Sequence, residues 1–162
     1  ITETSTGSGS IVFNKSGTQT YTSGWTISNT VNFTVNSGSM LQMAAGTTTI
    51  TGGGTFTLSS GATLGITSTA GITSSGATGN VQVTGTRSFS TGANYTYNGS
   101  AAQATGNGLP STVNNLTINN SSGVTLSANT TANGTLTLSS GNVITGANTL
   151  SISSTGSVTR TS

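Results

Sequence analysis

Short triplets of an apolar, a polar and an apolar residue recur along most of the chain, separated by turns that contain glycine. They lie at residues 25–27, 33–35, 41–43, 56–58, 64–66, 81–83, 95–97, 116–118, 124–126, 136–138 and 150–152. Alternation with a period of two indicates half-buried β-strands, because successive side chains of a strand point to opposite faces. Glycine readily adopts the positive φ of tight turns. Many successive triplets begin at the same short interval, as those at positions 25, 33 and 41 do. This spacing predicts short strands joined by tight turns.

A longer register groups these strands in threes. Similar phrases begin at Phe33, Phe56 and Val81, at nearly equal spacings. Three short strands with their turns fill each of these steps. The spacing therefore predicts an all-β fold, a parallel β-helix (β-solenoid) with three short strands per rung of about 20–25 residues. The alternative is a tandem of Ig-like β-sandwich modules.

A still longer similarity suggests two modules. Residues 54–72 and 134–152 match at 9 of 19 positions with an offset of 80. We therefore expect one β-solenoid module over residues 1–80 and a second, related one over residues 81–162. The segment 92–114 interrupts the pattern with small residues and Pro110, which is unfavourable inside a central strand. It is expected to form a loop or a junction.

The composition suits such a coil. Thr, Ser, Gly and Asn make up 104 of the 162 residues, whereas charged residues are 2%. Thr favours extended backbone and can cover an outer face, and stacked Asn side chains can form amide ladders at the turns. Parallel stacking would place like charges about 4.8 Å apart, so neutral side chains avoid repulsion.

The same composition excludes most catalytic chemistry. The chain has one acidic side chain, Glu3, and no His, Cys or Asp. Paired carboxylates, nucleophile–His pairs and zinc or calcium ligand sets therefore cannot be assembled from it. We expect no enzyme activity, no cofactor and no metal.

The charge and hydropathy of the sequence also limit the kinds of partner that the chain can bind. The cations are three isolated residues, Lys15, Arg87 and Arg160, so no phosphate-tracking patch is expected and no nucleic acid is predicted as a partner. No window of the sequence is apolar for long enough to cross a membrane, so no membrane-spanning helix is expected.

From Tyr95 onward the chain resembles a known kind of sequence. The phrases NNLTINN, TLTLSSGN and GANTLSI and the closing GSVTR carry the likeness. They are similar to repeat regions of large secreted, adhesin-like bacterial surface proteins, of the type found in Bacteroidetes. A looser similarity extends to autotransporter and filamentous-haemagglutinin β-helices. The resemblance covers residues 81–162 well and 25–80 weakly. The sequence departs from the family pattern in that no terminal sorting domain is recognised in it. It implies an extracellular or cell-surface location, a structural or adhesive role and no catalytic residues.

Two features could contact a ligand. Tyr95 and Tyr97, together with Trp25, could stack on a sugar ring, although packing in a core or loop is the simpler use of such rings. Thr-x-Thr pairs at 18–20, 47–49, 55–57 and 135–137 could belong to an ice-binding face. Such a face needs many consecutive ranks, and the scattered pairs favour an ordinary strand surface.

The sequence therefore predicts a structural segment of an extracellular bacterial surface adhesin or filament. It would provide a rigid, neutral stalk or a self-stacking fibre, as a fragment of a longer chain. Its partners would be further copies stacked end to end, or the continuation of the same chain, because open solenoid ends expose strand edges. The alternatives are a module that binds surface glycans and, less favoured, an ice-binding solenoid.

Overall fold

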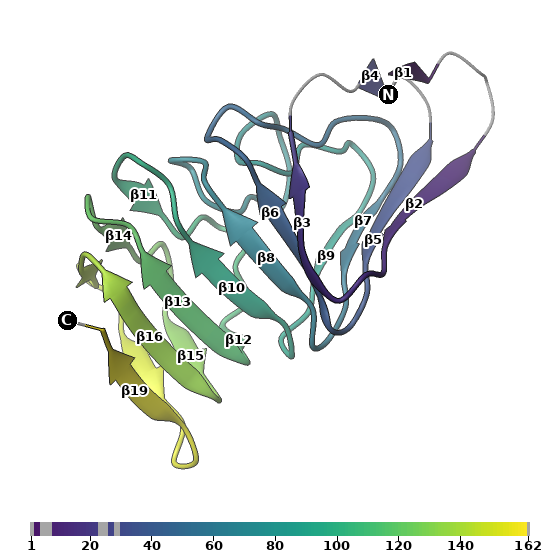
Figure 1. Cartoon of the computed structure of the whole chain (residues 1–162). Coiled ribbons are helices and arrows are strands. Elements are labelled where there is room, and N and C mark those ends of the chain that lie inside the picture. The colour runs from purple at the N-terminus through teal and green to yellow at the C-terminus, as the bar shows by residue number, and fades with distance from the viewer. Residues whose placement is uncertain (1, 4–7, 23–25, 28–29, 162) are drawn as a thin grey trace.

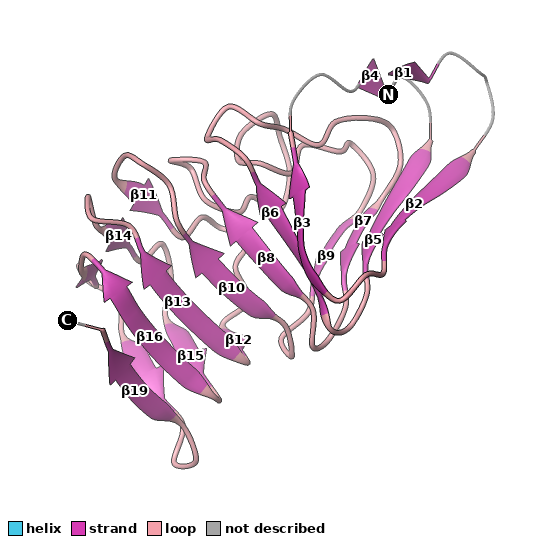
Figure 2. Cartoon of the chain, viewed as in Figure 1, coloured by secondary structure: helices cyan, strands magenta, loops and turns pink. Residues whose placement is uncertain are grey.

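A computed structural model describes residues 2–3, 8–22, 26–27 and 30–161 of the 162-residue chain. The described residues form an all-β parallel β-solenoid without a helix (Figures 1 and 2). Every pairing between its named strands is parallel. The predicted β-helix is therefore confirmed. Antiparallel sandwich modules are excluded, since their neighbouring strands run in opposite directions.

One sheet of seven strands runs along the whole stack and receives one strand from each turn of the coil. In spatial order its strands are β3 (Gly17–Tyr21), β6 (Ser39–Met43), β8 (Thr63–Ile66), β10 (Asn94–Tyr97), β13 (Asn115–Asn119), β16 (Thr135–Ser140) and β19 (Ser157–Arg160). The described part thus makes about seven turns. Its first and last turns lie at opposite ends of the stack (Figure 1).

Shorter sheets form the other sides of the coil. A four-stranded sheet contains β2 (Gly9–Phe13), β5 (Val31–Val35), β7 (Phe56–Leu58) and β9 (Arg87–Phe89). Later turns contribute β11 (Gln103–Ala104), β14 (Val124–Thr125) and β17 (Val143–Ile144) to one sheet, and β12 (Thr112–Val113), β15 (Thr130–Ala132) and β18 (Leu150–Ile152) to another. β1 (Thr2–Glu3) pairs with β4 (Thr26–Ile27). The predicted triplet 25–27 falls partly on β4, and its Trp25 lies outside the described residues.

The core is built from columns of apolar side chains stacked in register. On the seven-stranded sheet, Leu41 pairs with Leu64, and the column continues through Tyr95, Leu116 and Leu136. Each of these five side chains is buried. Alternate residues of the same strands face outward, so the period of two places apolar groups inside and Thr or Asn outside.

Asparagine side chains link successive turns, as the sequence predicts. Nδ2 of Asn36 donates to Oδ1 of Asn14 at 3.0 Å. Oδ1 of Asn94 accepts from the amides of Asn114 and Asn115, at 2.9 and 2.8 Å. These bonds between neutral groups run along the stacking direction and add to the backbone ladder.

Turn length is regular except at one place. Most register partners in the seven-stranded sheet are separated by similar lengths of chain, as Asn94 and Asn115 are, but a much longer segment separates Thr63 from its partner Asn94. The prediction that Val81 follows Phe56 in register is wrong. Phe56 pairs with Arg87, and Val81 forms a bridge with Ile50. The excursion over residues 67–80 lengthens this turn and shifts the register.

The expected loop or junction at 92–114 is also wrong. This segment contains β10, β11 and β12, all paired in parallel with neighbouring turns. Pro110 precedes β12 and so removes no bond from the ladder. The seven-stranded sheet continues across residues 80 and 81, where the sequence suggests a boundary between modules. The phrases related by the long offset fall in different sheets, on β7 and β16, so they do not occupy equivalent positions in the coil.

Candidate functional site

Tyr95 and Tyr97, the residues proposed from sequence as ligand contacts, both point into the solenoid. Each is 0% exposed, and each stacks in a column of apolar side chains. Their rings therefore contribute to the core and cannot contact a ligand, which corrects the prediction in favour of core packing. Trp25 lies outside the described residues.

The two hydroxyl groups are satisfied inside the protein. Tyr95 donates to the carbonyl of Ser90 and Tyr97 to the carbonyl of Thr105, each at 2.7 Å. Burial raises the pKa of both phenols, that of Tyr97 well above its ordinary value. Both rings therefore stay neutral over the whole physiological pH range.

Arg87 occupies an unusual position, an inward column of the four-stranded sheet. The column begins with Ile11, which pairs with Phe33, and Phe33 pairs with Phe56. On the next turn the residue paired with Phe56 is Arg87. A charged group in an apolar column is unfavourable unless polar groups surround it.

The long turn supplies those polar groups. Nε of Arg87 donates to the carbonyl of Val83 at 3.0 Å. Nη1 donates to the carbonyl and the hydroxyl of Thr73 at 3.1 and 2.8 Å, and Nη2 donates to the carbonyl of Gly76. All four acceptors are neutral oxygens. Partial burial lowers the pKa of Arg87 below its ordinary value, but the guanidinium remains charged at physiological pH.

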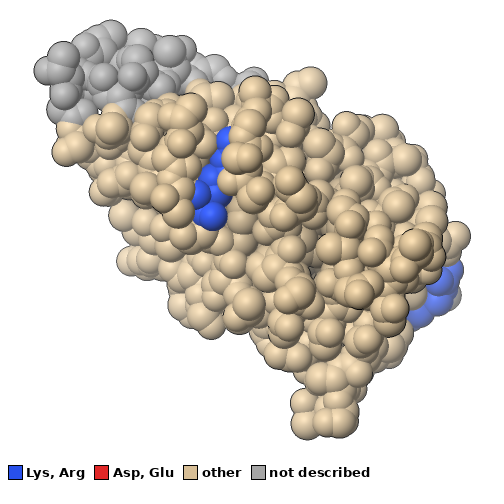
Figure 3. Space-filling view, turned by 180° about the vertical axis from the view of Figure 1, so that it is seen from behind, with Lys and Arg blue, Asp and Glu red and all other residues tan. Residues whose placement is uncertain are grey.

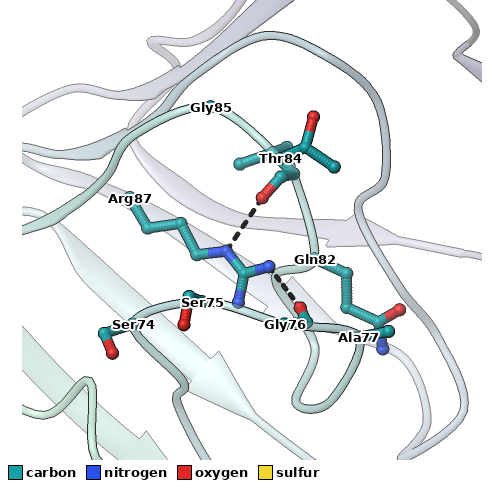
Figure 4. Close-up of a pocket in the computed structure, with 9 residues that line it drawn as sticks. Ser74, Ser75, Gly76, Ala77, Gln82, Thr84, Gly85 and Arg87 are labelled. Carbon is teal, nitrogen blue, oxygen red and sulfur yellow. Dashed lines mark hydrogen bonds between the residues drawn. The ribbon is translucent and has the colours of Figure 1, made fainter.

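A pocket of about 350 Å³ opens beside this guanidinium. Its lining consists of two short segments and Arg87: residues 74–77, and residues 82–85. Figure 4 shows the Arg87 side chain reaching between the two segments. The lining includes hydroxyl and amide groups but no acidic side chain. The arrangement can therefore bind a small neutral or anionic molecule but offers no general base.

Elsewhere the surface is almost uncharged. Figure 3 shows a face that is nearly all neutral, with cationic atoms confined to small separate areas. Lys15 and Arg160 are exposed, and neither lines the pocket. Within the described ranges no three metal-ligating side chains cluster, and no helix long and apolar enough to cross a membrane is present.

A second ordered feature lies on the outer face of the seven-stranded sheet. Thr96, Thr117, Thr137 and Thr159 pair in register on four consecutive turns. We call these four residues the threonine file. Their hydroxyls form no hydrogen bond with other described residues, whereas the neighbouring column is linked through Asn94, Asn115 and Thr135. Only Thr137 belongs to a Thr-x-Thr pair noted in the sequence, so that motif did not reveal the file.

Comparison with models of protein families, with curated proteins and with solved structures found no match to this chain. The pocket was missed from sequence because part of its lining, residues 74–77, comes from an excursion with no regular pattern. One signal was present: Arg87-Ser88-Phe89 has the alternation of a strand with a charge at an inward position.

Proposed function

We propose that the chain is a rigid structural segment of an extracellular bacterial surface protein, acting as a neutral stalk or a self-stacking fibre. The observation that carries the proposal is the seven-stranded parallel sheet, which passes through every turn of the coil. Such a stack resists bending because each turn is bonded to its neighbours by backbone ladders and apolar columns. The resemblance of residues 81–162 to secreted adhesin-like repeats supports the location.

The composition of the outer face supports the same role. Charged residues are 2% of the chain, so turns can stack without repulsion between like charges in register. The apolar columns reach the end of the described stack: Val158 pairs with Leu136 and is 59% exposed, and Val143, which pairs with the buried Val124, is partly exposed. Further coils, from the same chain or from another copy, would cover these groups.

The location is tested on cells of the organism that makes the protein. Antibodies raised against the purified chain, detected by immunogold electron microscopy, are expected to label the outside of intact cells. They should also mark thin projections or fibres. Label that appears only after the cells are lysed would overturn the proposal.

A second candidate function, ice binding, is favoured by the threonine file. On four consecutive turns the Thr hydroxyl groups have no hydrogen-bond partner in the described part of the chain. With their methyl groups, spaced about 4.8 Å apart, they form a regular surface that can order water. Thermal hysteresis of the purified protein tests this function. Activity that is lost in Thr117→Tyr but retained in Thr57→Tyr, on another sheet, would support it, and the absence of hysteresis would exclude it.

A further inference from the structure

We propose that the pocket beside Arg87 binds an acidic sugar unit through its carboxylate. Arg87 is the single charge in a column otherwise formed by Ile11, Phe33 and Phe56. An aliphatic side chain would satisfy the packing at this position without the cost of burying a charge. A departure of this kind from the local pattern is expected at a functional site.

The guanidinium is held in place but not neutralised. Four of its hydrogen bonds go to uncharged oxygens of Val83, Thr73 and Gly76, and these bonds fix the plane of the group. A guanidinium has five N–H donors, so one N–H of Nη2 is left without an acceptor among the described residues. A charge-assisted hydrogen bond to an anion would use this donor and match the positive charge.

The charge of the site selects a monoanion. Arg87 is the only cation among the lining residues, and no acidic side chain opposes it. A carboxylate carries the single negative charge that one guanidinium balances, whereas a phosphate dianion is usually bound by several cations or backbone N–H groups.

The rest of the lining suits the hydroxyl groups and carbon face of a sugar. The hydroxyls of Ser74 and Ser75 have no hydrogen-bond partner among the described residues, and both residues are exposed. Gln82 uses its Nε2 to bond the carbonyl of Gly79, which leaves its Oε1 as an acceptor. The exposed Ala77 adds apolar surface. A volume of about 350 Å³ lies within the range of small-ligand pockets.

This inference is independent of the proposed stalk function, since a stalk needs no pocket. It is tested by two-dimensional ¹H–¹⁵N NMR of the intact chain, titrated separately with glucuronate, glucose and acetate. Glucuronate is expected to shift the amide signals of residues 74–77 and 82–87 with a Kd on the order of 1 mM. Glucose lacks the carboxylate and acetate lacks the sugar ring, so each should bind at least about tenfold more weakly than glucuronate. Equal shifts with glucose or with acetate would overturn the proposal.

Amino-acid substitutions distinguish a role of Arg87 in ligand binding from a purely structural role. Arg87→Leu restores an apolar column and Arg87→Gln keeps a polar side chain; both should abolish the response to glucuronate. Lys15→Gln removes a charge outside the pocket and should leave the response unchanged. Ser75→Ala keeps every bond of Arg87 and should weaken glucuronate binding about threefold to tenfold at an unchanged melting temperature. If Ser75→Ala and Lys15→Gln bind glucuronate equally well, the ligand does not occupy this pocket.

Discussion

The hydroxyl of Tyr97 donates a 2.7 Å hydrogen bond to the carbonyl of Thr105, inside the solenoid and out of contact with water. Tyr95, two positions earlier on β10, forms an equivalent bond with the carbonyl of Ser90. Burial raises the pKa of both phenols above the ordinary value of 10. An ionised phenolate would lose its donor and place a charge in the core.

Stability is therefore expected to fall in alkaline solution. Because the pKa of each tyrosine is higher in the folded state than in the unfolded state, its stabilising contribution is complete below about pH 10 and is lost above it. The loss is about 1.4 kcal/mol per pH unit for each tyrosine. Melting temperatures measured between pH 8 and pH 12 by circular dichroism test this. The double variant Tyr95→Phe/Tyr97→Phe should decline less steeply, and an equal decline would contradict the assignment.

Asn80 joins the start and the end of the excursion to the preceding turn of the coil and should be essential for the excursion. Its Oδ1 accepts from the backbone N–H groups of Thr67 and Ser68, each at 2.9 Å, and its Nδ2 donates to the carbonyl of Thr48 at 2.8 Å. The residue is 2% exposed, so water cannot replace these bonds readily. Asn80→Ala is expected to lower the free energy of unfolding by about 2–4 kcal/mol.

Chemical denaturation measures this effect, and Asn107 provides a matched control. Asn107 is exposed and accepts one bond, from the backbone N–H of Ser74. Asn107→Ala should cost less than about 1 kcal/mol. Equal effects of the two substitutions would show that the buried amide of Asn80 has no special role.

Gly54 is required by the close approach of two turns. A Cβ at this position would lie 2.0 Å from the carbonyl oxygen of Val31, a backbone atom that cannot move aside alone. Gly54→Ala should therefore destabilise the protein by about 2 kcal/mol or more. Gly9→Ala is the control, since a Cβ there meets nothing within 4 Å. Thermal melts of the two variants give the comparison, and indistinguishable melting temperatures would argue against the packing between β5 and the turn before β7.

The coil could be predicted from sequence wherever local alternation and turn length are regular. The similar phrases that begin at Phe33 and Phe56 predict that these two residues lie in register one rung apart, and the structure pairs them. The corresponding prediction for the next rung, that Val81 lies in register with Phe56, is wrong. The long turn is closed by the side chain of Asn80, and nothing in the spacing signals where such an excursion begins.

The site was less accessible to prediction than the fold. Aromatic residues in a polar sequence suggest a binding surface, but Tyr95 and Tyr97 fill a core that few large residues are available to fill. The threonine file became visible only when register was known, because a whole turn of the coil separates each member from the next in the sequence. Arg87 offers a pocket because the excursion folds over it, a tertiary relationship that no local pattern contains.

The most direct test of the stacked coil is a pair of spin-label distances on the seven-stranded sheet. The chain has no cysteine, so paired cysteines at chosen positions can be labelled specifically. Thr20 and Thr159 lie on the first and last strands of the sheet, six strand spacings apart, and Thr117 lies four spacings from Thr20. At about 4.8 Å per spacing, the two distances should be about 29 and about 19 Å, apart from a common offset due to the labels. Narrow distributions that differ by about 10 Å are predicted. Broad distributions, or a Thr20–Thr159 distance no longer than the Thr20–Thr117 distance, would contradict a rigid stack of parallel turns.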